Sequence, residues 1–82
     1  NPFIHTVSIS FELPEPGFTS IEVYDLSGRI VTILENSNLS EGGHSIQWNG
    51  ISQNAGPVSS GLYFCRIESG GIIETTGLCV LK

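Results

Sequence analysis

Hydrophobic and polar residues alternate strictly over residues 7–13, in the order VSISFEL. In an extended chain, this alternation places all four hydrophobic side chains on one face and the three polar ones on the other. It therefore predicts a strand with one buried and one solvated face. Pro14 and Pro16 should end that strand, because proline has no backbone N–H to donate to a neighbouring strand.

The next pattern predicts a β-hairpin. Two runs rich in β-branched and aromatic residues, 21–24 and 29–34, flank the sequence Asp25-Leu26-Ser27-Gly28. Asp25 can accept hydrogen bonds from amides of the turn, and Gly28 can adopt the positive φ that closes it. Because both arms carry hydrophobic residues on both faces, we expect them to lie centrally in a sheet that is covered on each side.

Three more segments have strand character: residues 43–48, 61–67 and 72–81. The intervening stretches 35–43 and 49–60 are rich in Asn, Ser and Gly, which predicts surface loops. No window of ten residues has a helical period. The pattern predicts an all-β fold, an antiparallel immunoglobulin-like β-sandwich of six to seven strands that forms one domain over residues 1–82.

The core should centre on Trp48, the only tryptophan of the chain. A large aromatic side chain buries more area than any other residue of a small domain. The predicted core residues are Phe11, Val23, Val31, Trp48, Leu62 and Phe64.

Composition limits the partners. The 82 residues carry a net charge of −5, and the only basic residues are Arg29, Arg66 and Lys82. So few cations argue against nucleic acid and against anchoring on anionic lipid. No stretch approaches the roughly 20 apolar residues needed for membrane insertion. Charged residues make up 13% of the chain, about half the usual share, which suits an extracellular domain or one that packs against other proteins.

Residue patterns for catalysis or metal binding are missing from the sequence. His5 and His44 lie far apart, and neither has a second ligand at metal spacing. The loop 49–54 offers amides and hydroxyls but no carboxylate for calcium. A nucleophile, a base and an orienting acid cannot be assembled convincingly from many serines, two histidines and one aspartate. We therefore expect no enzyme activity, no cofactor and no metal site.

Cys65 and Cys79 leave two alternatives open. If Gly70-Gly71 is a two-residue turn, Cys65 lies opposite Thr76 and the sulfurs are out of reach of each other. If the loop is wider and centred on Ile72, Cys65 lies opposite Cys79 and a disulfide can form. An exported protein favours the disulfide, whereas the Gly-Gly turn favours free thiols.

Several motifs, in order along the whole chain, resemble the C-terminal immunoglobulin-like domains of secreted Bacteroidetes-type proteins. The immunoglobulin-like domain of the flagellar hook-capping protein has a similar pattern. The chain departs from the family at Asn49, where an acid usually follows the tryptophan, and at Gly77, where a basic residue often opens the last strand. The motifs that carry the resemblance are NPF at 1–3, ISFELP at 9–14, VYDLSGRIV at 23–31, GH at 43–44, WNG at 48–50, SGLYF at 60–64 and VLK at 80–82.

The resemblance implies a role in protein export. In that family the domain lies at the end of a larger exported protein and serves as the signal for type IX secretion to the cell surface, and it can be removed when the cargo is attached there. No residue is catalytic, and the partners are proteins of the secretion machinery. The implied recognition strand is Gly77, Leu78, Val80, Leu81 and Lys82. The chain also lacks methionine, so we expect it to be processed or part of a longer protein.

A second hypothesis does not depend on the resemblance. Several strands are apolar on both faces in a domain too small to cover them all, and such strands can pair with a neighbouring copy. The chain would then be a structural subunit or connector of an extracellular filament, a homo-polymer in which residues 1–6 form a linking arm.

Overall fold

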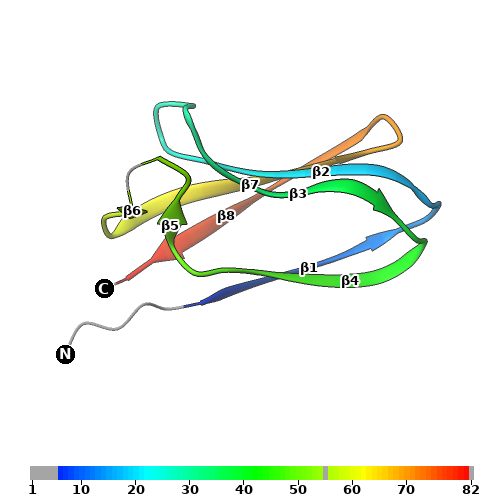
Figure 1. Ribbon diagram of the computed structural model, residues 1–82, viewed down its shortest axis with the longest axis horizontal. Helices are drawn as coiled ribbons and strands as arrows, with labels where there is room; N and C mark the ends of the chain where they lie inside the picture. The colour runs from blue at the N-terminus through cyan, green and yellow to red at the C-terminus, as the bar shows by residue number, and fades with distance from the viewer. Residues whose placement is uncertain (1–5, 55, 82) are drawn as a thin grey trace.

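The alternating segment at the start of the chain forms one half of a small sheet. In the computed structural model, which describes residues 6–54 and 56–81, β1 (Val7–Leu13) pairs antiparallel with β4 (Gly42–Trp48). The polar residues of β1 are exposed on the outer face of this sheet, and Ile9 and Leu13 are buried on its inner face. The two strands form the layer drawn below the larger sheet in Figure 1.

The other four long strands form the second layer, in the order β3-β2-β7-β8. All pairings are antiparallel, and two short strands of the long loop pair with each other. An all-β antiparallel sandwich is thus confirmed, with eight strands instead of six or seven. The bounds are β2 (Gly17–Tyr24), β3 (Ile30–Leu39), β5 (Ile51–Ser52), β6 (Gly56–Pro57), β7 (Gly61–Ser69) and β8 (Ile72–Val80).

The hairpin of β2 and β3 differs from the prediction in length and place. Residues 35–39, predicted as loop, continue β3 because they pair with residues 17–21 of β2. A backbone ladder supplies hydrogen bonds to any residue type, so the Asn and Ser residues there do not end the strand. β2 is central as predicted, whereas β3 lies at the edge of the sheet.

The turn between β2 and β3 is held by the side chain of Asp25. Its carboxylate accepts hydrogen bonds from the Ser27 amide (2.9 Å), the Ser27 hydroxyl (2.7 Å) and the Arg29 amide (3.0 Å). Gly28 closes the turn with φ of 89°, and its amide donates to the Asp25 carbonyl. These hydrogen bonds lower the pKa of Asp25, because each of them stabilises the ionised carboxylate.

The core lies between the two sheets and centres on Trp48, which is 2% exposed. The Trp48 indole N–H donates to the Ile51 carbonyl, 3.1 Å away. Its ring meets Tyr63 edge to face, with centroids 5.5 Å apart, and the Tyr63 hydroxyl donates to the Ser59 carbonyl. Both aromatic side chains therefore bury their rings while each polar group keeps a partner.

Two of the predicted core residues are not in the core. Val23 and Val31 are buried, and Phe11 packs half-buried against the core. Leu62, however, is 44% exposed, and Phe64 is only half-buried on the same outer face. Tyr63 and the alternate residues that follow it take the inward positions, so the prediction for β7 selected the wrong face. Since the segment is hydrophobic on both faces, its pattern does not show which one is buried.

The outer face of the large sheet has no covering layer among the described residues. The side chains of Phe18, Ile30, Ile33 and Ile73 are between 44% and 55% exposed. The expectation that the hairpin is covered on both sides is therefore wrong for the part of the chain described here. A two-layer sandwich buries only the inner face of each sheet.

We predict that replacing Asp25 with Asn destabilises the domain in a pH-dependent way. The pKa of Asp25 is lower in the folded protein than its ordinary value of 3.8, so the ionised form stabilises the fold above that pH. The contribution is lost as pH falls through the folded pKa. The melting temperature of Asp25→Asn should be below that of the wild type at pH 7, and the difference should narrow as the pH falls below 3.8. An equal difference at neutral and at acid pH would show that the charge has no role.

Candidate recognition surface

The last strand, β8, lies at an edge of the large sheet. It pairs with β7 over nine residues in continuous register, and no strand of the described residues pairs with its other side. An unpaired strand edge presents backbone N–H and C=O groups that a further strand can bind. Natural proteins often protect such edges with lysine, proline or a β-bulge. β8 has no lysine, proline or β-bulge. The absence of lysine and proline can already be seen in the sequence of residues 72–80.

The structure divides the expected recognition strand between two faces and the chain end. Leu78 and Val80 are 5% and 2% exposed in the core, so their side chains cannot contact a partner. Gly77 lies on the outer face, and Leu81, after the strand, is 64% exposed. Lys82 lies outside the described residues. The accessible parts of this segment are therefore the backbone edge, the outer face and Leu81.

Gly77 continues a row of side chains across the outer face. Tyr24 of β2 pairs with Phe64 of β7, which in turn pairs with Gly77. A Cβ atom at Gly77 would lie 3.8 Å from Cδ1 of Leu62, an ordinary contact distance. Gly77 thus adds no side chain of its own to this row, next to the hydrophobic side chains of Leu62 and Phe64.

Next to this row, the outer face carries a small charged network. The Tyr24 hydroxyl donates to Glu22 over 2.6 Å, and this hydrogen bond to a carboxylate is the main reason that the pKa of Tyr24 is raised. Arg66 lies 4.0 Å from Glu22 and 3.5 Å from Glu68. These side chains neutralise one another on the sheet surface, a role typical of partly exposed ion pairs.

The two cysteines are free and lie on opposite faces of the sheet. Gly70 and Gly71 both have positive φ, 58° and 83°, as a two-residue type I′ turn requires. The register then sets Cys65 opposite Thr76 and Cys79 opposite Leu62. Of the two alternatives from the sequence, the disulfide is therefore wrong. Burial raises the pKa of the Cys65 thiol to about 11, and Cys79 is exposed.

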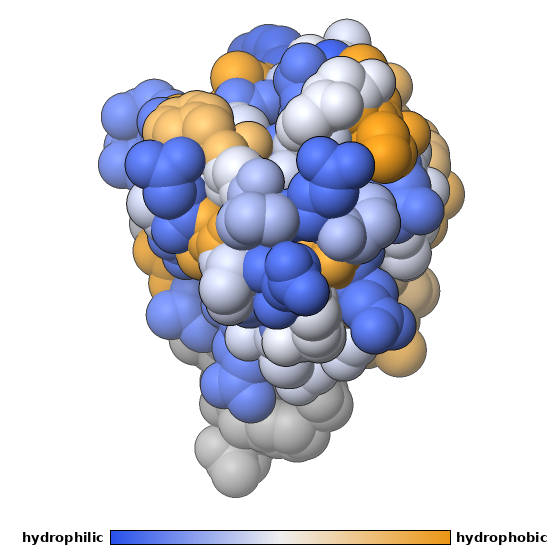
Figure 2. All heavy atoms as spheres, turned by 90° about the vertical axis from the view of Figure 1, so that its right-hand side faces the viewer, coloured by the Kyte–Doolittle hydropathy of each residue, from blue (hydrophilic) through white to orange (hydrophobic). Residues whose placement is uncertain are grey.

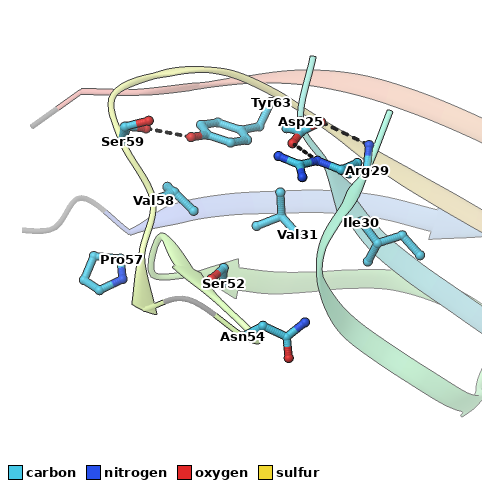
Figure 3. A pocket seen from close by; sticks show the side chains of 10 residues that line it. All are labelled: Asp25, Arg29, Ile30, Val31, Ser52, Asn54, Pro57, Val58, Ser59 and Tyr63. Atoms are coloured by element: carbon cyan, nitrogen blue, oxygen red, sulfur yellow. Dashed lines mark hydrogen bonds and ion pairs between the residues drawn. The ribbon is translucent and has the colours of Figure 1, made fainter. Parts of the chain in front are cut away.

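A hollow of about 630 Å³ lies at the end of the sandwich opposite the β7–β8 turn, between the β2–β3 turn and the loop before β7. Figure 3 shows that its polar side chains bind one another: Asp25 contacts Arg29, with 3.5 Å between the charged atoms, and Tyr63 reaches the carbonyl of Ser59. Because the Asp25 carboxylate already accepts three hydrogen bonds, it is poorly placed to act as a base or a metal ligand.

His44, a further candidate for catalysis or metal binding, takes part in contacts that hold the fold. His44 stacks on Phe11 with centroids 5.4 Å apart, and its Nε2 donates to the Ser40 carbonyl. His5 lies outside the described residues. Over residues 6–54 and 56–81, no three His, Cys, Asp or Glu side chains gather where they could hold a metal ion. The same residues contain no helix long and apolar enough to cross a lipid bilayer.

Comparison with known proteins gives one match. The model of a protein family described as the secretion system C-terminal sorting domain matches residues 1–81. Neither a curated protein nor a solved structure matches the chain significantly. The match covers all the described strands, including the free edge of β8.

We predict that the two thiols react at very different rates. A thiol of pKa about 11 has about a hundredfold less thiolate than one at the ordinary value of 9.0, and Cys65 is also inaccessible. Treatment of the folded chain with iodoacetamide at pH 8, followed by mass spectrometry, should modify Cys79 rapidly and Cys65 only after denaturant is added. Cys79→Ser should abolish the fast phase and Cys65→Ser should leave it unchanged. Fast modification of both thiols, or a mass showing a disulfide, would contradict the register.

Proposed function

This chain belongs to the family of secretion system C-terminal sorting domains, and on that premise we propose that the free edge of β8 is the surface by which the secretion machinery recognises it. Its function is that of a sorting signal, which marks an exported protein for type IX secretion to the cell surface or the medium. Its partners are proteins of that machinery. The family is non-catalytic in general.

The continuous, unprotected edge of β8 is the observation that carries the proposal. Main-chain hydrogen bonds to an added strand depend little on side-chain identity. A secretion machinery that exports many different proteins could therefore bind such an edge without a conserved side-chain pocket. Over residues 77–80, the burial of Leu78 and Val80 supports this interpretation, because it leaves the backbone edge, Gly77 and Cys79 as the accessible parts.

Hairpin geometry indicates which amides face outward. In a two-residue turn, the flanking residues Ser69 and Ile72 form a hydrogen-bonded pair. Hydrogen-bonded and non-bonded pairs then alternate along the two strands. We infer that Ile73, Thr75, Gly77 and Cys79 direct their backbone groups away from β7, while the residues between them bond to it.

Leu81 adds a side chain to this edge. It follows the strand directly and is 64% exposed, although leucine gains free energy by leaving water. A partner strand on β8 would extend past Leu81 and could cover it. Leu81 is therefore the proposed side-chain anchor of the recognition strand.

We also propose that the domain itself catalyses no reaction. The family is non-catalytic in general, and the polar side chains with the best geometry, Asp25 and His44, hold a turn and a carbonyl in place. The Cys65 thiol is buried, and its raised pKa of about 11 keeps it protonated at neutral pH.

The proposal predicts that proline at position 75 blocks export without unfolding the domain. Thr75→Pro removes an amide that faces outward, so the ladder with β7 is kept and only strand addition is lost. Loss of a main-chain hydrogen bond worth about 1.4 kcal/mol lowers binding about tenfold. The measurement is the fraction of a carrier protein, fused to residues 1–82, that a host with type IX secretion exports.

Thr75→Val is the matched control, because it changes the same side chain and keeps the amide. It should export like the wild type, and circular dichroism should show that both variants are folded. Normal export of folded Thr75→Pro would overturn the role of the β8 edge, although the family assignment would stand.

A second function, self-association, is favoured by the uncovered outer face. Four hydrophobic side chains there, Phe18, Ile30, Ile33 and Ile73, are about half exposed. The register places Ile30 and Ile33 near each other on β3, opposite Tyr24 and Glu22, and adjoining exposed apolar side chains can mark a protein interface. The linking arm expected at the start of the chain lies, except for Thr6, outside the described residues.

If copies of the domain pack through this face, sedimentation equilibrium at about 0.5 mM protein should give a mean mass above 8.8 kDa. Ile33→Ser should restore the monomer mass, because it places a hydroxyl in the apolar contact. Ser8→Ala on the solvated face of β1 serves as the control and should leave the association unchanged. A monomer at every concentration would exclude the structural-subunit hypothesis.

A further inference from the structure

The small sheet covers only part of the large one, which leaves a groove beside β1. On the inner face of β8, Leu78 and Val80 are buried, whereas Ile72, Glu74 and Thr76 are exposed. Two strands packed on four cannot cover every inner position. The small sheet ends at β1, and the uncovered inner residues of β8 lie beside this strand.

The groove is apolar at its base and narrow. It encloses about 200 Å³ between β1 and the β7–β8 hairpin, with Phe11, Leu13, Ile67 and Ile72 among its lining residues. A second hollow of about 90 Å³ shares Ile72 with it and runs toward the β7–β8 turn. Sites for drug-sized ligands and cofactors are usually larger, about 300–1,000 Å³. The dimensions suit the side chains of an extended peptide.

A free strand edge borders the same groove. Among the described residues, β1 pairs with β4 only, so its other side presents unpaired backbone groups. A peptide strand added there would place alternate side chains into the groove and the others on the solvated face of the small sheet. This edge is separate from the β8 edge proposed above for recognition.

The charges around the groove point to the chemistry of the occupant. Glu12 and Glu74 line the groove and Glu15 lines its extension, and all three are exposed. None of them forms an ion pair within the described chain, since Arg29 and Arg66 pair with other carboxylates. A strand that covered Glu74 without supplying a cation would leave its charge desolvated and unpaired, which is costly.

We propose that this groove binds an extended, basic segment of a partner protein, in which hydrophobic residues alternate with Lys or Arg, as an added strand on the free edge of β1. The hydrophobic side chains that enter the groove pack on Ile72 and Phe11, the cations on the solvated side pair with Glu12 and Glu15, and a long Lys or Arg side chain at the border of the groove reaches Glu74. A second copy of this chain fits poorly, because its net charge is −5 and it has only three basic residues.

The groove opens at the end of the sandwich that holds the β1–β2 and β7–β8 turns, on the right in Figure 1. That end faces the viewer in Figure 2, where hydrophobic surface appears in patches separated by hydrophilic side chains.

The experiment titrates the isotope-labelled chain with three capped seven-residue peptides, in which valine alternates with lysine, with glutamate or with serine. Only the lysine peptide should bind well, and the amide resonances that shift should be those of β1 and of residues 69–74. Raising the salt concentration from about 0.05 to 0.5 M should weaken binding severalfold, because it screens the ion pairs.

Matched variants distinguish binding in the groove from a general attraction between the negatively charged chain and the basic peptide. Glu74→Gln should weaken binding of the lysine peptide about threefold to fivefold. Glu41→Gln, which removes the same charge from an exposed turn, should leave the binding unchanged. Ile72→Ser should weaken binding, while Ile33→Ser on the outer face should leave it unchanged. Native-like amide spectra will show that each variant is folded.

Three outcomes would overturn the proposal: equal binding of the glutamate peptide, no binding of the lysine peptide up to about 1 mM, or shifts confined to the outer face or the β8 edge. Concentration-dependent shifts at the groove without peptide would show that a second copy is the occupant and would also overturn it. Thr75→Pro should bind the lysine peptide normally, so failure here is distinguishable from failure of the proposed export surface.

Discussion

The structure depends on burying one face of a four-stranded sheet beneath a sheet of only two strands. The residues with the least exposure, Thr19, Ile21, Val23 and Cys65, lie on the inner face of the large sheet, and Trp48 of the small sheet is almost as fully buried. A chain of this size cannot bury a larger core. Strands beyond the overlap are therefore held by backbone pairing more than by packing, and they remain open on one face or one edge.

These uncovered strand edges and sheet faces connect the fold to its function as a sorting signal. A sorting signal has to be bound by another protein, and among the described strands β1 and β8 each have one unpaired edge. The edges differ in character. The β8 edge carries only one charged residue, Glu74, and follows the Gly70-Gly71 turn, whereas the β1 edge borders an apolar groove with acids on its rim.

The turn between β2 and β3 is stabilised by hydrogen bonds within the turn itself. Asp25 satisfies three donors within five residues, so the β2–β3 connection needs no support from the core. The other long loop is held differently, because the hydroxyl of the core residue Tyr63 binds the Ser59 carbonyl and Val58 packs against the core. Of these two connections, only the one between β2 and β3 is therefore self-contained.

The sequence by itself determined the fold class, the β1 strand, the Asp25 turn and Trp48 as the centre of the core, because each depends on local geometry or on a residue without an equivalent elsewhere in the chain. It also determined the family, through motifs spread over residues 1–81. Only the tertiary structure decided the face of β7 that is buried, since Leu62 and Tyr63 are both suited to a core. It likewise decided the continuation of β3 through residues 35–39, which pairing with β2 enforces against their composition. The separation of Cys65 from Cys79 and the groove beside β1 arise from strand register and from the unequal width of the two sheets, and neither property belongs to any single segment of the chain.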